Sequence, residues 1–197
     1  MSNPMKGSMA DYSDDRLVEL AKKKDVEAFA ELARRSQERI FYGILALTKN
    51  HQDAGDLTQE ALMQAFRSLK TFKQRSSFNT WVYRIAVNLT LNFLKKGKRE
   101  GTRQVLDESL SWVEAKEEAS HSPERGSLKR ELSRKLQEAV DSLPLPYKVS
   151  FVLVVFQGMT YNQAARVLGC SENTISWRMH KARKKLQARL RPYLEGR

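Results

Sequence analysis

Apolar side chains recur at a helical spacing of three to four residues along most of this chain. In the N-terminal half this pattern predicts helices at residues 14–24, 25–48, 52–69 and 78–96. In the C-terminal half it predicts helices at about residues 128–142, 146–157, 161–168 and 172–190. The apolar stripe of the third helix contains Leu57, Ala61, Leu62, Ala65, Phe66 and Leu69. The pattern therefore predicts an all-α protein built from two small helical domains.

One segment, VSFVLVVF at residues 149–156, is rich enough in β-branched residues to suggest a strand. A single strand has no partner to pair with, because no other segment of the chain has a strand pattern. We therefore expect residues 149–156 to belong to a buried helix.

Residues 101–127 break the helical pattern and predict a linker between the two domains. This segment has weak periodicity, many charges and the helix breakers Gly101, Pro123 and Gly126. It also contains apolar residues that are unusual in a simple spacer, namely Leu106, Leu110, Trp112 and Val113. The expected organisation is an N-terminal extension at 1–13, a first domain at 14–100, the linker at 101–127 and a second domain at 128–192.

The charge of the chain is strongly basic and unevenly distributed. Its 197 residues carry a formal net charge of +12. Residues 66–99 contain 9 basic and no acidic residues, and residues 158–197 contain 9 basic and 2 acidic residues. A surface that serves only solubility tends to mix its signs, so two basic blocks favour two contacts with a polyanion such as nucleic acid. A solvated basic surface is the alternative.

Several other classes of protein are disfavoured. No apolar run approaches the roughly 20 residues of a membrane span, and residues 1–15 lack the apolar core of a secretory signal. The single cysteine, Cys170, excludes an intramolecular disulfide, and one cysteine with three scattered histidines disfavours a zinc site. No phosphate-binding loop or nucleophile–base pair is visible. We expect a cytoplasmic, non-enzymatic protein without cofactor, metal or small-molecule substrate.

The sharpest local signal is a helix-turn-helix within residues 160–186. Thr160 and Gln163 form a capping-box pattern at the start of the first helix, and Gly169 supplies the left-handed position that ends it. Ala165 allows close helix approach, and Ile175 fills the angle between the helices. This spacing is typical of DNA-reading motifs whose second helix enters the major groove. An ordinary helical hairpin with a basic face is the alternative.

The second helix of this motif has an apolar stripe and a polar face. Polar groups in its N-terminal half suit base edges, and cations in its C-terminal half suit phosphates. The candidate DNA-binding residues of this face are Ser171, Glu172, Asn173, Thr174, Ser176, Trp177, Arg178, Lys181 and Arg183. Trp177 is ambiguous, because it could contact DNA sugars or a thymine methyl group, or pack against the domain.

Three segments in order carry a family resemblance. DAGDLTQEALMQAFRSL (53–69) and FKQRSSFNTWVYRIAVNLTLNFLKKGKR (72–99) resemble region 2 of extracytoplasmic-function (ECF) sigma factors of the sigma-70 family. Residues 142–186 resemble region 4 of the same family. The resemblance covers about residues 14–190 apart from the linker. It implies a protein that binds core RNA polymerase and directs it to promoters, with region 4 reading the minus-35 duplex and region 2 reading and melting the minus-10 element.

The resemblance also implies a polymerase-binding face in the first domain. Asp56, Gln59 and Glu60 match the polar face that meets the coiled coil of the largest polymerase subunit. Their i, i+3 and i+4 spacing places them on one side of a helix. From the residues alone, a solvated helix face is the simpler interpretation.

Minus-10 binding is expected along residues 78–99. Asn88 matches a base-reading pocket of the family, and the loop Lys73–Ser77 matches the loop that shapes that pocket. Tyr83 and Arg84 could line the strand path, whereas the spacing of Trp81 favours a core position. Cations at the end of this helix are expected to bind phosphates, namely Lys95, Lys96, Lys98 and Arg99.

The resemblance leaves three matters open. Many family members carry a second basic residue where this chain has Ser176 and Trp177, so the minus-35 sequence is not predicted. An anti-sigma factor is implied as a partner, by analogy, and it could hold the protein at the inner membrane. The alternative function is a helix-turn-helix regulator that binds operator DNA without acting as a sigma factor, which would leave the block from Asp56 to Arg99 unexplained.

Overall fold

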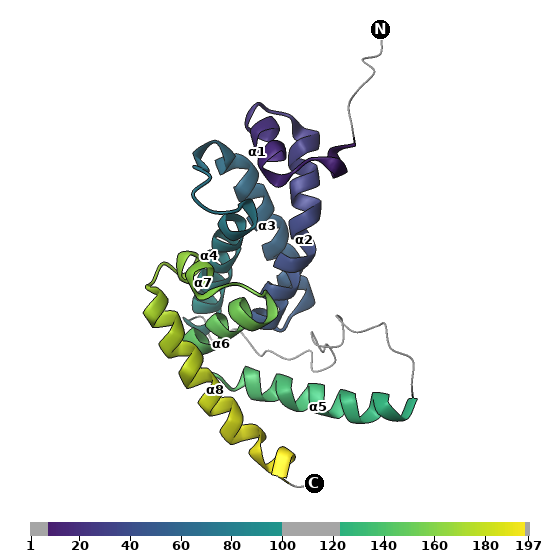
Figure 1. The fold of residues 1–197 in the computed structure, drawn as a ribbon, viewed down its shortest axis with the longest axis vertical. Coiled ribbons are helices and arrows are strands. Elements are labelled where there is room, and N and C mark those ends of the chain that lie inside the picture. The colour runs from purple at the N-terminus through teal and green to yellow at the C-terminus, as the bar shows by residue number, and fades with distance from the viewer. Residues whose placement is uncertain (1–7, 100–122, 196–197) are drawn as a thin grey trace. The chain divides into compact units, whose positions relative to one another are not determined.

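The computed structural model describes residues 8–99 and 123–195, and every regular element among them is helical (Figure 1). This confirms the all-α prediction. The described residues form two compact units. The first holds the N-terminal helices up to Ile44 and from His51 onward, and the second holds Leu45–Asn50 with the C-terminal helices.

The first unit contains two short 3₁₀ turns and four α-helices, of which α2 extends with its last residues into the second unit. Their bounds are η1 Met9–Asp11, α1 Asp14–Lys22, α2 Val26–Thr48, α3 His51–Ser68, η2 Leu69–Thr71 and α4 Phe78–Arg99. Ser13 caps α1 by accepting a hydrogen bond from the Arg16 amide at 3.3 Å. The four predicted helices are all present, with ends that differ by up to three residues.

The core of the first unit forms where the apolar stripes of these helices meet. Leu17, Leu32, Ile40 and Val82 are at most 1% exposed. A buried polar contact also joins two helices, because the Ser36 hydroxyl of α2 donates to Asn79 Oδ1 of α4 at 2.7 Å. The stripes therefore fix α4 against α2 and α3, which leaves the opposite face of α4 exposed.

Arg35 of α2 fastens the start of the chain to this bundle. Its guanidinium lies 2.9 Å from Asp14 Oδ1 and 2.7 Å from Glu31 Oε1. It also donates to the backbone carbonyls of Met9, Ala10 and Tyr12. One half-buried cation thus holds η1 and the start of α1.

The second unit contains the remaining helices. Their bounds are α5 Pro123–Asp141, α6 Leu145–Phe151, η4 Val152–Phe156, α7 Tyr161–Leu168 and α8 Glu172–Glu195. Residues 149–156 are helical as expected, since α6 passes directly into the π-helical turn η4. Val149, Val152 and Leu153 are at most 2% exposed, so the β-branched residues serve as core.

Two boundaries differ from the sequence-based expectation. α5 begins at Pro123, inside the segment predicted as linker, because proline is well tolerated in the first turn of a helix. α8 continues through Pro192 to Glu195, beyond the expected end near residue 190. The rest of the predicted linker, including Leu106, Leu110, Trp112 and Val113, lies outside the described residues.

Candidate nucleic-acid and partner interfaces

The helix-turn-helix is built by local capping, as the sequence predicts. Thr160 Oγ1 accepts a hydrogen bond from the Gln163 amide at 3.2 Å, and Gln163 Oε1 accepts one from the Thr160 amide at 2.9 Å. α7 ends at Gly169, whose φ of 63° and ψ of 37° lie in the left-handed region. The capping box and the glycine together set where α7 begins and ends, and so where α8 starts.

α8 is fixed against α7 by both polar and apolar contacts. Ser171 Oγ accepts a hydrogen bond from the Thr174 amide at 3.1 Å, which caps the helix. Asn162 of α7 donates to Glu172 at 3.3 Å. Along the inner stripe, Ile175 and Met179 are fully buried. The inner stripe therefore determines which residues of α8 face outward.

The outward face of α8 presents most of the residues that the sequence singles out. Arg178 and Thr174 are half-buried. The others are exposed, namely Ser171, Glu172, Asn173, Ser176, Trp177, Lys181 and Arg183. Amide, hydroxyl and aromatic groups thus precede a run of cations, which is an arrangement suited to base edges followed by phosphates.

Trp177 lies at the outer edge of the domain and is 52% exposed. Its ring meets the ring of Tyr147 on α6 edge-on, with centroids 5.7 Å apart. Lys181 Nζ lies over the indole, 5.7 Å from the ring centroid. The two sequence-based interpretations of Trp177 are therefore compatible, because the ring packs against the domain and still presents half of its surface.

A second polar and basic surface follows the outer side of α4. Arg84 and Asn88 are exposed and lie four residues apart, so they share one face. Lys95, Lys96 and Lys98 are exposed in the last turns of the helix. Arg99 ends α4, and its side chain lies outside what the structure describes. The described cations extend from the same helix that carries Asn88.

Tyr83 does not belong to this surface. It is 4% exposed, and its hydroxyl donates to the Arg39 backbone carbonyl of α2. Burial raises the pKa of its phenol well above the usual range. The prediction that Tyr83 lines a strand path is contradicted by this position, because a buried ring offers no face to a nucleic acid base.

The loop before α4 rests on an aromatic cluster. Trp81 stacks on Phe72 with centroids 4.8 Å apart and planes 26° apart. Phe78 contacts both rings. Lys22 Nζ donates to the Phe72 carbonyl at 2.6 Å, which ties α1 to the start of the loop. Trp81 is half-buried in this cluster and acts as packing, in agreement with the spacing argument.

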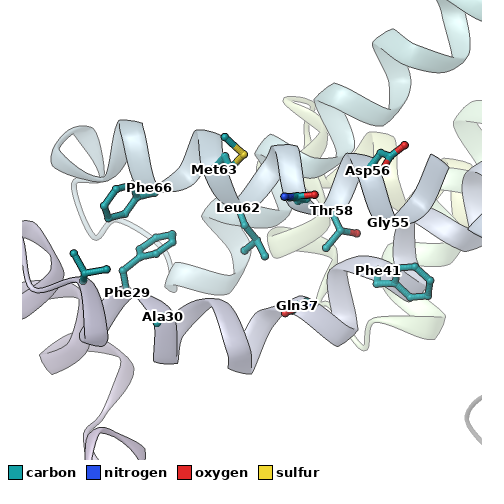
Figure 2. Close-up of a pocket in the computed structure, with 12 residues that line it drawn as sticks. Phe29, Ala30, Gln37, Phe41, Gly55, Asp56, Thr58, Leu62, Met63 and Phe66 are labelled. Carbon is teal, nitrogen blue, oxygen red and sulfur yellow. The ribbon is translucent and has the colours of Figure 1, made fainter. Parts of the chain in front are cut away.

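A groove of about 750 Å³ lies between α2 and α3 (Figure 2). Asp56 and Gln59 line it, whereas Glu60 is exposed on the same helix but does not. Its apolar lining includes Phe29, Phe41, Leu62, Met63 and Phe66. In Figure 2, Phe29 and Phe66 lie at one end of the groove, and Phe41 and Asp56 lie at the other. Aromatic rings therefore lie at both ends of the groove, and the carboxylate of Asp56 lies at the Phe41 end.

The sequence analysis missed the apolar part of this groove. Val26, Met63 and Phe66 are 64%, 46% and 45% exposed. Phe66 belongs to the apolar stripe of its helix, but it reaches the surface beside Phe29, with ring centroids 4.8 Å apart. Periodicity identifies an apolar stripe, but it does not show how much of the stripe the neighbouring helices cover. The exposure of these residues therefore could not be predicted from the sequence.

Neither a candidate membrane span nor a candidate metal site is found among the described residues. No helix within 8–99 and 123–195 has the length and apolarity of a membrane span. In the same residues no group of three or more histidine, cysteine, aspartate or glutamate side chains could hold a metal ion.

Two family models match the chain. Residues 32–100 match sigma-70 region 2, and residues 133–186 match sigma-70 region 4. The chain is 32% identical over 184 residues to the RNA polymerase sigma-H factor of Pseudomonas aeruginosa, with 92% of this chain and 95% of the relative covered. It is 30% identical over 186 residues to the ECF RNA polymerase sigma-E factor of Escherichia coli K12, with 92% and 96% covered.

Solved structures are similar as well. The sigma factor RpoE of Bartonella quintana, determined with the anti-sigma factor NepR, has a TM-score of 0.63 and 25% identity, covering 83% of this chain and 96% of that one. CnrH, determined with the cytosolic domain of CnrY, has a TM-score of 0.66 and 22% identity, covering 90% and 96%. The second likeness concerns the fold.

Proposed function

The chain belongs to the ECF sigma factors of the sigma-70 family, and we propose that it performs the sigma function through three separate surfaces. The groove between α2 and α3 binds core RNA polymerase, the outer side of α4 binds the minus-10 element, and the outer face of α8 binds the minus-35 duplex. The observation that carries this proposal is that the mainly apolar groove, with Asp56 in its lining, and the basic helix faces are distinct surfaces. A transcription initiation factor needs such a division, because it must hold a protein and a polyanion at the same time.

The groove suits a helical protein partner with basic side chains. Its apolar floor offers Leu62, Met63 and Phe66 to an apolar helix stripe, and large exposed apolar side chains of this kind mark interaction sites. Asp56 and Gln59 at the edge offer a carboxylate and an amide for hydrogen bonds that fix the register of the partner. The coiled coil of the largest polymerase subunit is the occupant that the family implies.

The outer side of α4 suits a separated DNA strand. Asn88 can both donate and accept hydrogen bonds at a base edge, and Arg84 lies one turn away on the same face. Lys95, Lys96 and Lys98 supply the charge that phosphates require. Tyr83 takes no part, and we assign the face to Arg84, Asn88 and the cations that follow.

The outer face of α8 suits the major groove of duplex DNA. Ser176, Trp177 and Arg178 lie where a recognition helix meets base edges, and Lys181 and Arg183 lie where it meets phosphates. The absence of acidic residues from this part of the helix after Glu172 removes like-charge repulsion with the DNA backbone.

An anti-sigma factor is proposed as the regulatory partner. The similar structure of RpoE from Bartonella quintana contains one, and the groove between α2 and α3 has the apolar area that a partner helix needs. Occupation of that groove would exclude core polymerase, so one surface would serve both activity and inhibition.

The proposal is tested at the groove. The double variant Asp56→Ala/Gln59→Ala should bind core polymerase at least tenfold more weakly, because loss of hydrogen bonds that include a charged group costs about 1.5–3 kcal/mol. Binding of minus-35 duplex by the same protein should be unchanged. Binding of labelled protein to core polymerase, measured by fluorescence anisotropy, checks the first expectation.

A matched control is available in the same unit. Asp15→Ala/Gln64→Ala removes the same two side-chain types from exposed positions that do not line the groove, and it should bind polymerase like the unaltered protein. Equal weakening by both double variants, or equal loss of polymerase and DNA binding by the first, would contradict the assigned role.

A further inference from the structure

Trp177 combines exposure with a position that suits base contact. Like Tyr193 near the other end of α8, it is a large apolar side chain that is exposed, with 52% of its surface open. It lies in the second turn of α8, on the part of a recognition helix that approaches base edges. Exposure of an indole to water is unfavourable, and such a group gains free energy when apolar surface covers it.

Few apolar groups are exposed in the major groove of DNA. Guanine, adenine and cytosine present hydrogen-bond donors and acceptors there, and the C5-methyl group of thymine is the apolar feature. Phosphates are polar and charged, so they are matched by Lys181 and Arg183 rather than by an indole. Among the four bases, thymine is therefore the one whose major-groove edge offers an apolar group to Trp177.

We propose that Trp177 is a specificity-determining residue that reads thymine C5-methyl groups in the minus-35 duplex, with Tyr147 as its positioning residue. This inference rests on the proposed minus-35 role of α8. It adds the class of base that the helix selects.

Tyr147 supports the indole from outside the recognition helix. It lies in α6, is half-buried, and meets Trp177 edge-on with centroids 5.7 Å apart. Edge-to-face contacts of this kind favour one ring orientation over the alternatives. A ring held in place loses less conformational freedom when it binds DNA, so Tyr147 raises discrimination without touching the base.

Lys181 completes the arrangement. Its ammonium group lies 5.7 Å from the indole centroid, one helical turn after Trp177. The cation is thereby held beside the ring, where it can contact a phosphate while the indole contacts a base.

The test compares thymine with uracil, which lacks only the C5-methyl group. Minus-35 duplexes are first selected from a randomised pool by core polymerase carrying the full-length protein. Each thymine of the selected element is then replaced by uracil, one position at a time. At one or two positions the affinity should fall about fourfold, the value that burial of one methyl-sized group predicts.

The variants assign this effect to residues. Trp177→Ala should bind thymine and uracil duplexes equally, and Tyr147→Ala should reduce the difference while Tyr147→Phe retains it. Tyr193→Ala removes an aromatic ring of similar exposure near the other end of α8 and should leave the difference intact. Each comparison uses one preparation with two duplexes, so a partly folded variant lowers both affinities and leaves their ratio informative.

The possible outcomes distinguish a failure of the thymine inference from a failure of the proposed sigma function. Equal binding of thymine and uracil by the unaltered protein would overturn this inference and leave the minus-35 role standing. Retention of the fourfold difference in Trp177→Ala would overturn it as well. Failure of the holoenzyme to select any duplex would overturn the proposed function, and this inference with it.

Discussion

Gly169 shows how a single residue shapes the DNA-binding motif. Its φ of 63° places it in the left-handed region, while a Cβ added there would meet nothing within 4 Å. Gly169→Ala should therefore cost about 1 kcal/mol through backbone conformation alone. Native-state hydrogen exchange of the α7 and α8 amides measures this loss.

Gly55→Ala is the matched control for that substitution. Gly55 also has open space around its Cβ position, but it lies inside α3 without a positive φ. Alanine there should stabilise α3 by about 0.5–1 kcal/mol. The change in stability should therefore have opposite signs at the two positions. Stabilisation by both substitutions would show that the backbone at position 169 does not require glycine.

Lys181 gives a residue-scale prediction for DNA binding. Lys181→Ala should lower affinity for duplex DNA almost regardless of sequence and reduce the slope of log affinity against log salt by about one. Lys23→Ala removes an exposed lysine at the C-cap of α1 and should leave that slope unchanged. A sequence-selective loss on Lys181→Ala would argue against a phosphate contact.

Individual residues were predictable from sequence where a local rule applies. Thr160, Gly169 and Ile175 follow from spacing within one motif, and the structure confirms their positions. The burial of Tyr83 and the exposure of Phe66 depend on how neighbouring helices cover a stripe. Lys148 is a further example, because burial lowers its pKa although Asp141 lies 2.7 Å away, and nothing in its local sequence marks it as buried.

At the scale of elements, α2 carries an ionic cluster that responds to acid. Hydrogen bonds from Arg34 and then Arg35 lower the pKa of Glu31 from 4.5 to about 2. A lowered carboxyl pKa stabilises the folded state above pH 4.5, and this contribution is lost as pH falls toward 2. Glu31→Gln should therefore melt at a lower temperature than the unaltered protein at pH 7.

The pH dependence distinguishes this effect from a packing defect. The difference in melting temperature, followed by circular dichroism, should shrink as pH falls from about 4.5 to 2. A difference that stays constant over this range would mean that the carboxylate charge of Glu31 is not what stabilises α2.

Helix positions were largely predictable because amphipathic periodicity reflects burial directly. The π-helical turn η4 and the continuation of α8 through Pro192 were not, since both depend on local backbone adjustment that a residue pattern does not encode. The start of α5 at Pro123 follows a local rule, although the sequence pattern was interpreted as a linker there. Proline breaks a helix in its interior but is tolerated in the first turn.

At the scale of the whole molecule, the proposed function predicts that the two units contribute to separable steps of initiation. Asn88→Ala should impair promoter opening more than formation of the closed complex, because its amide meets bases only after the strands part. Permanganate reactivity of unpaired thymines measures opening, and duplex retardation measures the closed complex. Gln64→Ala, which removes an exposed side-chain amide from α3, is the control. Unchanged melting with Asn88→Ala would remove this residue from the site.

The presence of two separate basic surfaces was predictable from the sequence, because the two basic blocks lie in different units. The groove between α2 and α3 was only half predictable. Its acidic edge has a family motif, while its apolar floor arises from the packing of α2 on α3 and required the structure.

The most direct test of the account is transcription itself. Core RNA polymerase supplemented with the full-length protein should produce run-off transcripts from a subset of fragments of the source genome, and core polymerase alone should produce none from them. Retardation of duplex DNA by the protein without a transcript from any fragment would contradict the sigma function and indicate a DNA-binding regulator instead.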